Sequence, residues 1–203
     1  MLLNVPVINV APFHDGDAAT RRGIAAQVGQ PIHDIGFLVI TGHGVDPGLI
    51  RHVQAASNAF FDLSEAEKNR VLRPAPDVTR GYIPLEAESV GRSQGLDVPG
   101  DLNESLMIGP VDVPETEYFF GPSAGKHFHP NLWPEQPAEL RGLYEAYFRA
   151  MGALAEDLMA MFALALDLDE AFFADKINHH ISRLRERKRA AQRVPPQPGE
   201  LLG

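Results

Sequence analysis

The sequence predicts an α+β fold, and three observations lead to that prediction. Two short segments, 5–10 and 36–41, have the β-branched and apolar composition of strands. Between and after them, apolar residues recur every three or four positions, which is the period of amphipathic helices. The longest such pattern, 138–166, carries an apolar stripe that must be buried against something large, and a sheet is the element best suited to cover it.

The first four elements are predicted in the order strand, helix, strand, helix. Segment 5–10 is expected to be an edge strand because Pro6 cannot donate a backbone hydrogen bond. Helical spacing then covers 18–34, although Pro31 is expected to end that helix early. Segment 36–41 is a continuous apolar run, which predicts a strand buried on both faces.

A tight turn follows, with His43 between two glycines. We interpret His43 as a hydrogen-bonded corner residue rather than a metal ligand, because no acidic residue is nearby to complete a site. Asp46 is a suitable N-cap, and Pro47 suits the first position of the next helix. The expected buried stripe of this helix comprises Leu49, Ile50, Val53, Ala56, Ala59 and Phe60. Ser64 and Glu67 match a capping box that begins another short helix.

The second half begins with a long segment, 74–137, that is rich in Pro and Gly. It is expected to form loops with one strand near 102–108, and its length predicts a functional or partner-covered surface. The strongest helix follows at 138–166. Asp169 is then expected to cap a shorter helix, with its inward residues Phe172, Phe173 and Ile177.

Composition excludes several classes of protein. The 203 residues contain no cysteine, which excludes disulfides, thiolate zinc sites and cysteine nucleophiles. With 27 acidic and 18 basic residues the net charge is -9, which argues against general nucleic-acid binding. A basic run at 183–193 is the exception; we interpret it as a solvated, frayed tail, with a contact to an acidic partner or nucleic acid as the alternative.

Targeting signals are not found in the sequence. No apolar run approaches the ~18 residues that a membrane-spanning helix needs. The first ten residues lack a basic region and a small-residue cleavage site. We therefore expect a cytoplasmic protein with no membrane partner.

Several short motifs, taken in order, resemble one family. They are Val5-Pro6-Val7-Ile8-Asn9, the stretch from Gly36 to Val45, Phe60-Phe61-Asp62-Leu63, Arg80-Gly81-Tyr82, Asp101-Leu102-Asn103-Glu104, Asn131-Leu132-Trp133-Pro134 and Leu168-Asp169-Glu170. Together they resemble the N-terminal region of the isopenicillin-N-synthase-like non-haem oxygenases, which depend on 2-oxoglutarate and Fe(II). The resemblance covers Val5 to about Arg185 and resumes at Pro195.

The resemblance implies an N-terminal helical support layer and the first strands of a double-stranded β-helix, or jelly roll. It divides the chain into a non-haem dioxygenase N-terminal domain, 1–185, and a basic, Pro-rich tail, 186–203, where the Fe(II)/2-oxoglutarate domain would begin. The helix at 138–166 resembles the family's long helix along the sheet. In such a fragment its apolar face would be partly uncovered, which predicts self-association.

The family's iron and 2-oxoglutarate ligands are not in this sequence. Complete members hold iron with a His-x-Asp pair and a distal His, and grip 2-oxoglutarate with an Arg-x-Ser pair. None of the eight histidines here is followed two places later by an acid, and no Arg is followed two places later by Ser. The C-terminal catalytic half is therefore expected to be absent, with neither Fe(II) nor 2-oxoglutarate binding this chain.

Candidate site residues follow from the same resemblance. Arg80, Tyr82 and Glu86 lie in a loop that would approach the pocket for a small-molecule substrate; the alternative is a solvated loop anchored by Tyr82. His127 and His129 would point the same way on an extended strand. Together with His179 and His180, they are the most closely spaced histidines in the sequence. A physiological metal site would need a further ligand.

Two functional hypotheses follow. In the first, the chain is the N-terminal portion of an Fe(II)/2-oxoglutarate oxygenase, an oxidoreductase acting on a small molecule. In the second, it is a non-catalytic binding or remnant domain that keeps the helical support layer. We take the first to describe its origin and the second its activity as a separate chain.

Overall fold

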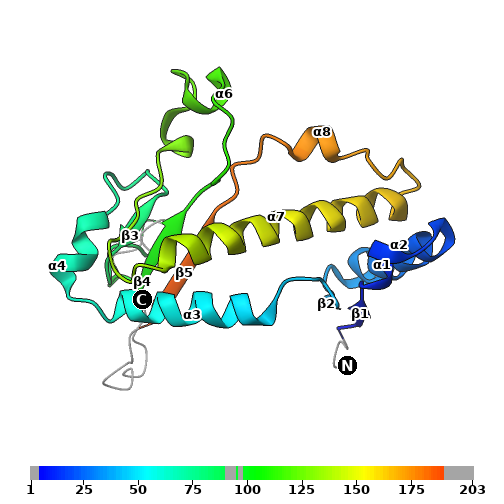
Figure 1. The fold of residues 1–203 in the computed structure, drawn as a ribbon, viewed down its shortest axis with the longest axis horizontal. Coiled ribbons are helices and arrows are strands. Elements are labelled where there is room, and N and C mark those ends of the chain that lie inside the picture. Colours follow the sequence, from blue (N-terminus) through cyan, green and yellow to red (C-terminus); the bar gives the residue numbers. More distant parts are fainter. Residues whose placement is uncertain (1–4, 90–94, 96–97, 190–203) are drawn as a thin grey trace. The chain divides into compact units, whose positions relative to one another are not determined.

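The computed structural model describes residues 5–89, 95 and 98–189 of the chain (Figure 1). It divides into two compact units. Unit 1 comprises Met1–Ile50 and Arg149–His180, and unit 2 comprises Arg51–Phe148 and Ile181–Gly203. Secondary structure of both kinds occurs in each unit, as the α+β prediction requires.

Unit 1 begins with a small parallel sheet. Strands β1 (Val7–Asn9) and β2 (Val39–Thr41) pair in parallel, with Ile8 opposite Ile40. Helices α1 (Pro12–Asp15) and α2 (Ala18–Ile35) connect them. The core of this unit combines residues of the sheet, of α1 and α2, and of the long helix α7: Ile8, Val10, Phe13, Ile24, Ala25, Val28 and Met161.

Two expectations for unit 1 are wrong. Helix α2 does not end early but continues through Pro31 to Ile35, because proline removes only its own N–H bond and the last turn is closed by Gly36. The Gly36 N–H donates to the carbonyls of Pro31 and Ile32 from a left-handed conformation (φ 74°), which suits glycine. Strand β2 is not buried on both faces: Val39 is 47% exposed, because only the Ile40 side of this sheet packs against the core.

The next helices begin at the residues that the sequence predicts. Helix α3 spans Pro47–Phe61, and Asp46 accepts hydrogen bonds from the N–H groups of Gly48 (2.8 Å) and Leu49 (3.3 Å). Helix α4, Glu65–Lys68, has the reciprocal capping box of Ser64 and Glu67 and leads into the 3₁₀ helix η1, Asn69–Val71. The buried face of α3 comprises Val53, Ala56, Ser57, Phe60 and Phe61.

Unit 2 contains a three-stranded antiparallel sheet in the order β3-β4-β5. Its strands are β3 (Gly81–Ile83), β4 (Asn103–Ile108) and β5 (Leu184–Arg189). Strand β4 confirms the strand expected near 102–108. Strand β5 shows that the frayed-tail expectation is wrong for the start of the basic run, because residues 184–189 pair with β4 along its whole length. The rest of that run, from 190, lies outside the described residues.

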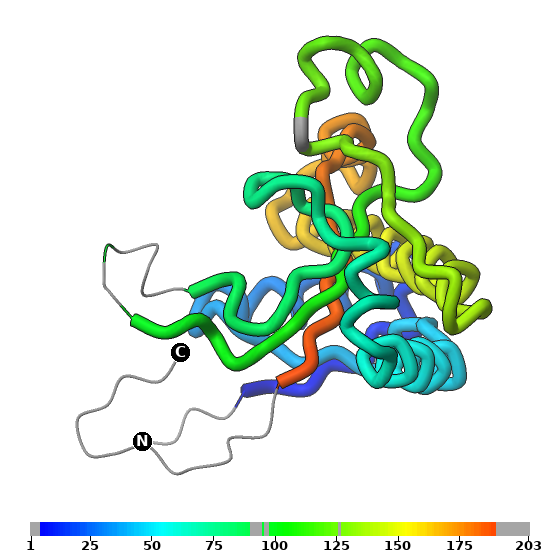
Figure 2. Tube along the Cα trace, turned by 90° about the vertical axis from the view of Figure 1, so that its left-hand side faces the viewer, coloured from blue at the N-terminus to red at the C-terminus, as the bar shows by residue number. Residues whose placement is uncertain are grey.

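The segment between β4 and the long helix extends away from this sheet (Figures 1 and 2). It carries helix α6 (Glu117–Phe120) and the 3₁₀ helix η2 (Gly125–Phe128). His127 is therefore part of a helical turn and not of an extended strand, which corrects the expected geometry of His127 and His129. Among the described residues, no group of three or more histidine or acidic side chains could hold a metal ion.

Helix α7, Leu140–Ala165, confirms the long helix expected at 138–166. Its fully buried residues include Leu140, Tyr144 and Met161. Helix α8, Ala174–Ile177, has no buried residue, and the expectation that Phe172 points inward is wrong. Phe172 instead packs edge-on against Phe173, and its face is covered by the Lys176 ammonium. No helix in the described part of the chain is long and apolar enough to cross a membrane.

Candidate functional site: a cavity around Arg80

A cavity of about 250 Å³ lies in unit 2, where β4 ends and the segment with α6 and η2 begins. Its lining combines cations, aromatic rings and polar side chains: Arg80, Pro110, Val111, Val113, Phe119, Phe120, Phe128, His129, Pro130, Asn131, Trp133, Arg141 and Glu145. Of the three candidate substrate residues from the sequence, the structure brings Arg80 to this cavity.

The Arg80 side chain is a buried cation, with only 2% of its surface exposed. Its Nη1 donates to the carbonyl and the hydroxyl of Thr79, at 2.8 and 3.1 Å, and its Nη2 donates to the carbonyl of His127 at 2.7 Å. Burial, followed by the nearby positive charge of Arg183, lowers the pKa of Arg80 to about 10. The guanidinium therefore remains charged at neutral pH.

Gly109, directly after β4, provides the space for this guanidinium. A Cβ at position 109 would lie 1.8 Å from Nη2 of Arg80, so any other residue here would force the guanidinium to shift. Asn131 fixes this backbone: its Oδ1 accepts from the Gly109 N–H at 2.8 Å, and its Nδ2 donates to the carbonyls of Gly109 and Pro110. Asn131 was identified as part of a motif that carries the family resemblance but not as a site residue, and a glycine directly after a strand is too common to indicate a site.

Aromatic rings form the apolar part of the lining. Phe119 and Phe128 pack edge-to-face with centroids 4.8 Å apart, and Phe120 leaves 62% of its surface exposed. On the α7 side, Trp133 packs edge-on against Tyr144 at 6.4 Å, and the Arg141 guanidinium lies 5.7 Å from the Trp133 ring. Because Trp133 is the only tryptophan in the chain, its fluorescence reports on this cavity alone.

Tyr82 and Glu86 are placed elsewhere. The Tyr82 ring is 3% exposed, and its hydroxyl donates to Glu104 Oε2 at 2.6 Å. Burial, with Glu104 as acceptor, raises the pKa of Tyr82 well above its usual value. Glu86 follows β3 with a left-handed backbone (φ 61°) and an exposed side chain. Neither residue lines the cavity of Arg80.

A second charged network joins β4 to β5 and to the loop after β3. Glu88 pairs with both Arg73 (2.8 Å) and Arg185, and Arg185 also donates to Ser105. Burial raises the pKa of Glu88, but the hydrogen bonds and charges of Arg185 and Arg73 outweigh burial, so the net pKa lies below its usual value. This network holds β5 in register.

Comparison with known proteins identifies the family. Residues 5–136 match the family model described as "non-haem dioxygenase in morphine synthesis N-terminal". The chain belongs to this family. This is the family that the order of motifs in the sequence indicated.

Curated relatives from bacteria and fungi agree with this assignment. The chain is 28% identical over 178 residues to validamycin A dioxygenase of Streptomyces hygroscopicus subsp. limoneus, covering 87% of the chain and 47% of the relative. It is 31% identical over 196 residues to a 2-oxoglutarate-Fe(II) type oxidoreductase of Aspergillus fumigatus, covering 95% of the chain and 55% of the relative. The chain thus spans about half the length of these relatives.

Solved structures share the fold. The crystal structure of a full-length Neurospora crassa protein in complex with alpha-KG matches 90% of the chain with a TM-score of 0.71 at 24% identity, over 53% of that protein. A 2OG-Fe(II) oxygenase family protein from Caulobacter crescentus matches 90% with a TM-score of 0.74 at 21% identity, over 55% of its length. The chain therefore has the fold of the corresponding part of these proteins.

The residues present do not fit an iron site. The sequence lacks both the His-x-Asp pair and the Arg-x-Ser pair, and the described residues contain no cluster of three metal ligands. Arg80 is not the arginine of an Arg-x-Ser clamp, because Tyr82 stands two places after it.

Proposed function

We propose that this chain is the substrate-recognising N-terminal part of a 2-oxoglutarate- and Fe(II)-dependent oxygenase acting on a small molecule. The observation that carries the proposal is the cavity built around the buried Arg80, in a chain of this family whose sequence lacks the ligands of iron and of 2-oxoglutarate. The chain provides a substrate wall, and the first strands of the family's jelly roll are β4 and β5. The jelly-roll strands and the reaction itself would be completed by a C-terminal half.

The alternative is a binding domain without catalysis. The same cavity would serve that function, because a cavity can bind a ligand with or without an iron site. Two measurements separate these functions. The first is an anaerobic titration of the 203-residue chain with Fe(II) and 2-oxoglutarate, followed by the weak visible charge-transfer band of their complex. We expect no band; a saturable band at one equivalent would contradict the assignment of the iron ligands to a missing half.

The second measurement starts from the nucleotide sequence after the Gly203 codon. An open frame that encodes His-x-Asp, a distal His and Arg-x-Ser should give a longer product that consumes 2-oxoglutarate. A frame without these residues, or a longer product that has them and consumes no 2-oxoglutarate, would favour the binding domain. The matched control is the longer product with the His of His-x-Asp replaced by Ala.

We also propose a cytoplasmic protein that self-associates through exposed apolar side chains of α7, which include Met151 at 39% exposure. Association would remove this apolar surface from water. Light scattering and thermal melting at two concentrations test this: association makes the melting temperature rise with concentration. A monomer with a concentration-independent melt would contradict it.

A further inference from the structure

Arg80 has hydrogen-bonding capacity that its protein partners do not use. A guanidinium carries five N–H donors, and the three described hydrogen bonds go to Thr79 and His127. All three acceptors are uncharged oxygens. A cation with only 2% of its surface exposed is normally paired with a carboxylate, because burying an unpaired charge is costly. Arg80 therefore lies at the cavity wall without a described carboxylate partner.

The surroundings add positive charge rather than removing it. Arg183 is close enough for its charge to act on Arg80. Elsewhere in the lining, Arg141 is neutralised by Glu145, to which its Nε donates at 2.9 Å. The described charged side chains of the lining thus sum to a positive value, since Arg80 is the cation that remains uncompensated. An anionic group is the ligand that this field favours.

The rest of the lining selects for a ring. Phe119, Phe120, Phe128 and Trp133 surround the cavity, and aromatic faces and edges favour a planar aromatic ligand. The volume of about 250 Å³ is smaller than the roughly 300–1,000 Å³ of sites for drug-sized ligands. This space fits one ring with a short substituent.

We infer that the cavity around Arg80 binds a single-ring aromatic carboxylate, with the carboxylate against the guanidinium of Arg80 and the ring among Phe119, Phe128 and Trp133. The inference rests on the proposed function, because it names the substrate class of the site that this chain contributes. Its test needs neither Fe(II) nor turnover, so its failure is distinguishable from failure of the proposed oxygenase activity.

The decisive experiment compares two probes of equal shape on the unmodified chain. 4-Fluorobenzoate and 4-fluorobenzamide are titrated separately, with ¹⁹F NMR for the ligand and Trp133 fluorescence for the cavity. We expect the benzoate to bind about tenfold or more tightly than the benzamide, since hydrogen bonds to a charged acceptor are the stronger ones. Equal affinities, or no change in Trp133 fluorescence, would overturn the inference.

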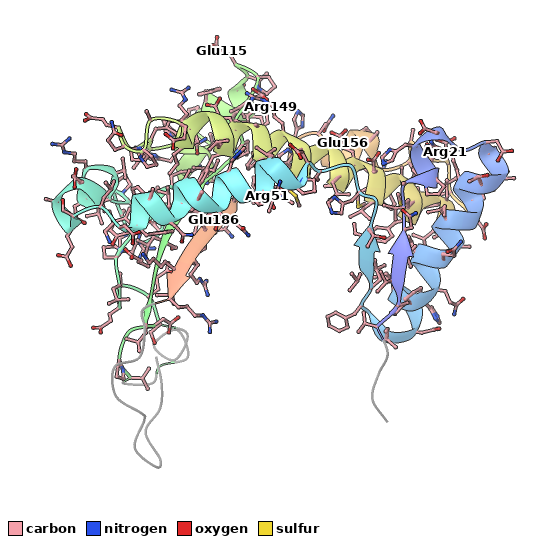
Figure 3. The ribbon with its side chains drawn as sticks, turned by 60° about the horizontal axis from the view of Figure 1, so that its bottom comes forward. Arg21, Arg51, Glu115, Arg149, Glu156 and Glu186 are labelled. Carbon is pink, nitrogen blue, oxygen red and sulfur yellow. The ribbon has the colours of Figure 1, made fainter. Side chains whose placement is uncertain are left out.

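Variants then assign the charge to Arg80. In Arg80→Gln the preference for benzoate over benzamide should vanish. In Phe120→Ala both affinities should fall together, because this exposed ring contributes apolar contact and no charge. The matched control is Arg51→Gln, which removes one cation from the exposed surface of α3 outside the cavity (Figure 3) and should leave both affinities unchanged.

Two further outcomes protect the test. If Arg80→Gln does not fold, as judged by its thermal melt, the comparison of benzoate with benzamide on the unmodified chain decides alone. 2-Oxoglutarate is titrated as a competitor, because it is an anion without a ring. Displacement of 4-fluorobenzoate by equimolar 2-oxoglutarate would overturn the inference and would assign the cavity to aliphatic anions.

Discussion

Replacement of Glu104 by Gln should destabilise unit 2 more than any surface charge substitution. Glu104 Oε2 accepts from Lys68 Nζ and from the Tyr82 hydroxyl, each at 2.6 Å. The side chains of Lys68 and Glu104 are only 9% and 14% exposed. In Glu104→Gln the shape is kept, but the Lys68 ammonium is left buried with two uncharged described partners, the Phe61 carbonyl and the face of the Tyr82 ring.

The expected cost is about 3 kcal/mol, at the lower end of the ~3–5 kcal/mol for removing one partner of a buried ion pair, because the glutamine oxygen can still accept from Tyr82. That is a large fraction of the roughly 5–15 kcal/mol by which domains are stable. Urea denaturation followed by far-UV circular dichroism measures the loss. In the double variant Lys68→Met/Glu104→Gln most of the stability should return, since no buried charge remains and the glutamine oxygen still accepts from Tyr82.

The matched control is Glu135→Gln. Glu135 pairs with Arg70, and both side chains are largely exposed, at 82% and 66%. This substitution should leave the urea midpoint within experimental scatter. A loss for Glu104→Gln of less than about 1 kcal/mol, the range of exposed pairs, would refute the reasoning that burial makes this ion pair contribute more to the free energy of unfolding than an exposed pair does.

Three further predictions concern the same unit. Because the pKa of Glu88 lies below its usual 4.5, its contribution to stability is present above that pH and is lost as pH falls through the lower folded-state pKa. Glu88→Gln should therefore be less stable than the unmodified chain at pH 7, as measured by urea denaturation, and the difference should shrink in acid. Burial raises the pKa of Glu186, so Glu186→Gln should be more stable at pH 7 and equal to the unmodified chain below about pH 4.5; no gain at pH 7 would contradict this. Gly109→Ala should lower the urea midpoint by overpacking against Arg80, at a cost of roughly 1–3 kcal/mol, and an unchanged midpoint would show that the guanidinium can move.

Elements with local signals were predictable from the sequence. Asp46, Ser64 and the apolar stripe at 138–166 each act within one or two helical turns, so the chain near them decides the outcome. The wrong prediction at Pro31 also concerns a local signal. The proline removes only one hydrogen bond, whereas Gly36, five residues later, closes the last turn of the helix. The end of α2 follows the cap and not the proline.

Strand β5 could not be predicted, because its stability comes from a distant segment. Residues 184–189 are mostly charged and have no apolar alternation. They form a strand because β4 supplies the backbone partner, and because Arg185 reaches Ser105 and Glu88, which are 80 and 97 residues away in the chain. Propensity over a short window does not contain this information.

The cavity was predictable only in part, because it too depends on contacts between segments that are distant in the chain. Arg80 was identified through a short motif, and the structure brings it to the cavity. Gly109 and Asn131 escaped, because their roles depend on an approach between segments 22 residues apart and on the space that a missing Cβ leaves for Arg80. Sequence patterns locate charged residues, but the packing around them decides which charges lack a partner.

The buried cations of unit 2 differ in whether a carboxylate neutralises them. Lys68 is nearly buried and has Glu104 at 2.6 Å; Arg185 is partly buried and shares Glu88. Arg80 is the most deeply buried of the three, yet its described partners are two carbonyls and a hydroxyl. A fold that compensates its other buried cations with carboxylates leaves this one uncompensated where a cavity opens, and departures from local consistency concentrate at functional sites. A bound anion would restore the balance, so an anionic ligand should raise the melting temperature of the chain as well as occupy the cavity.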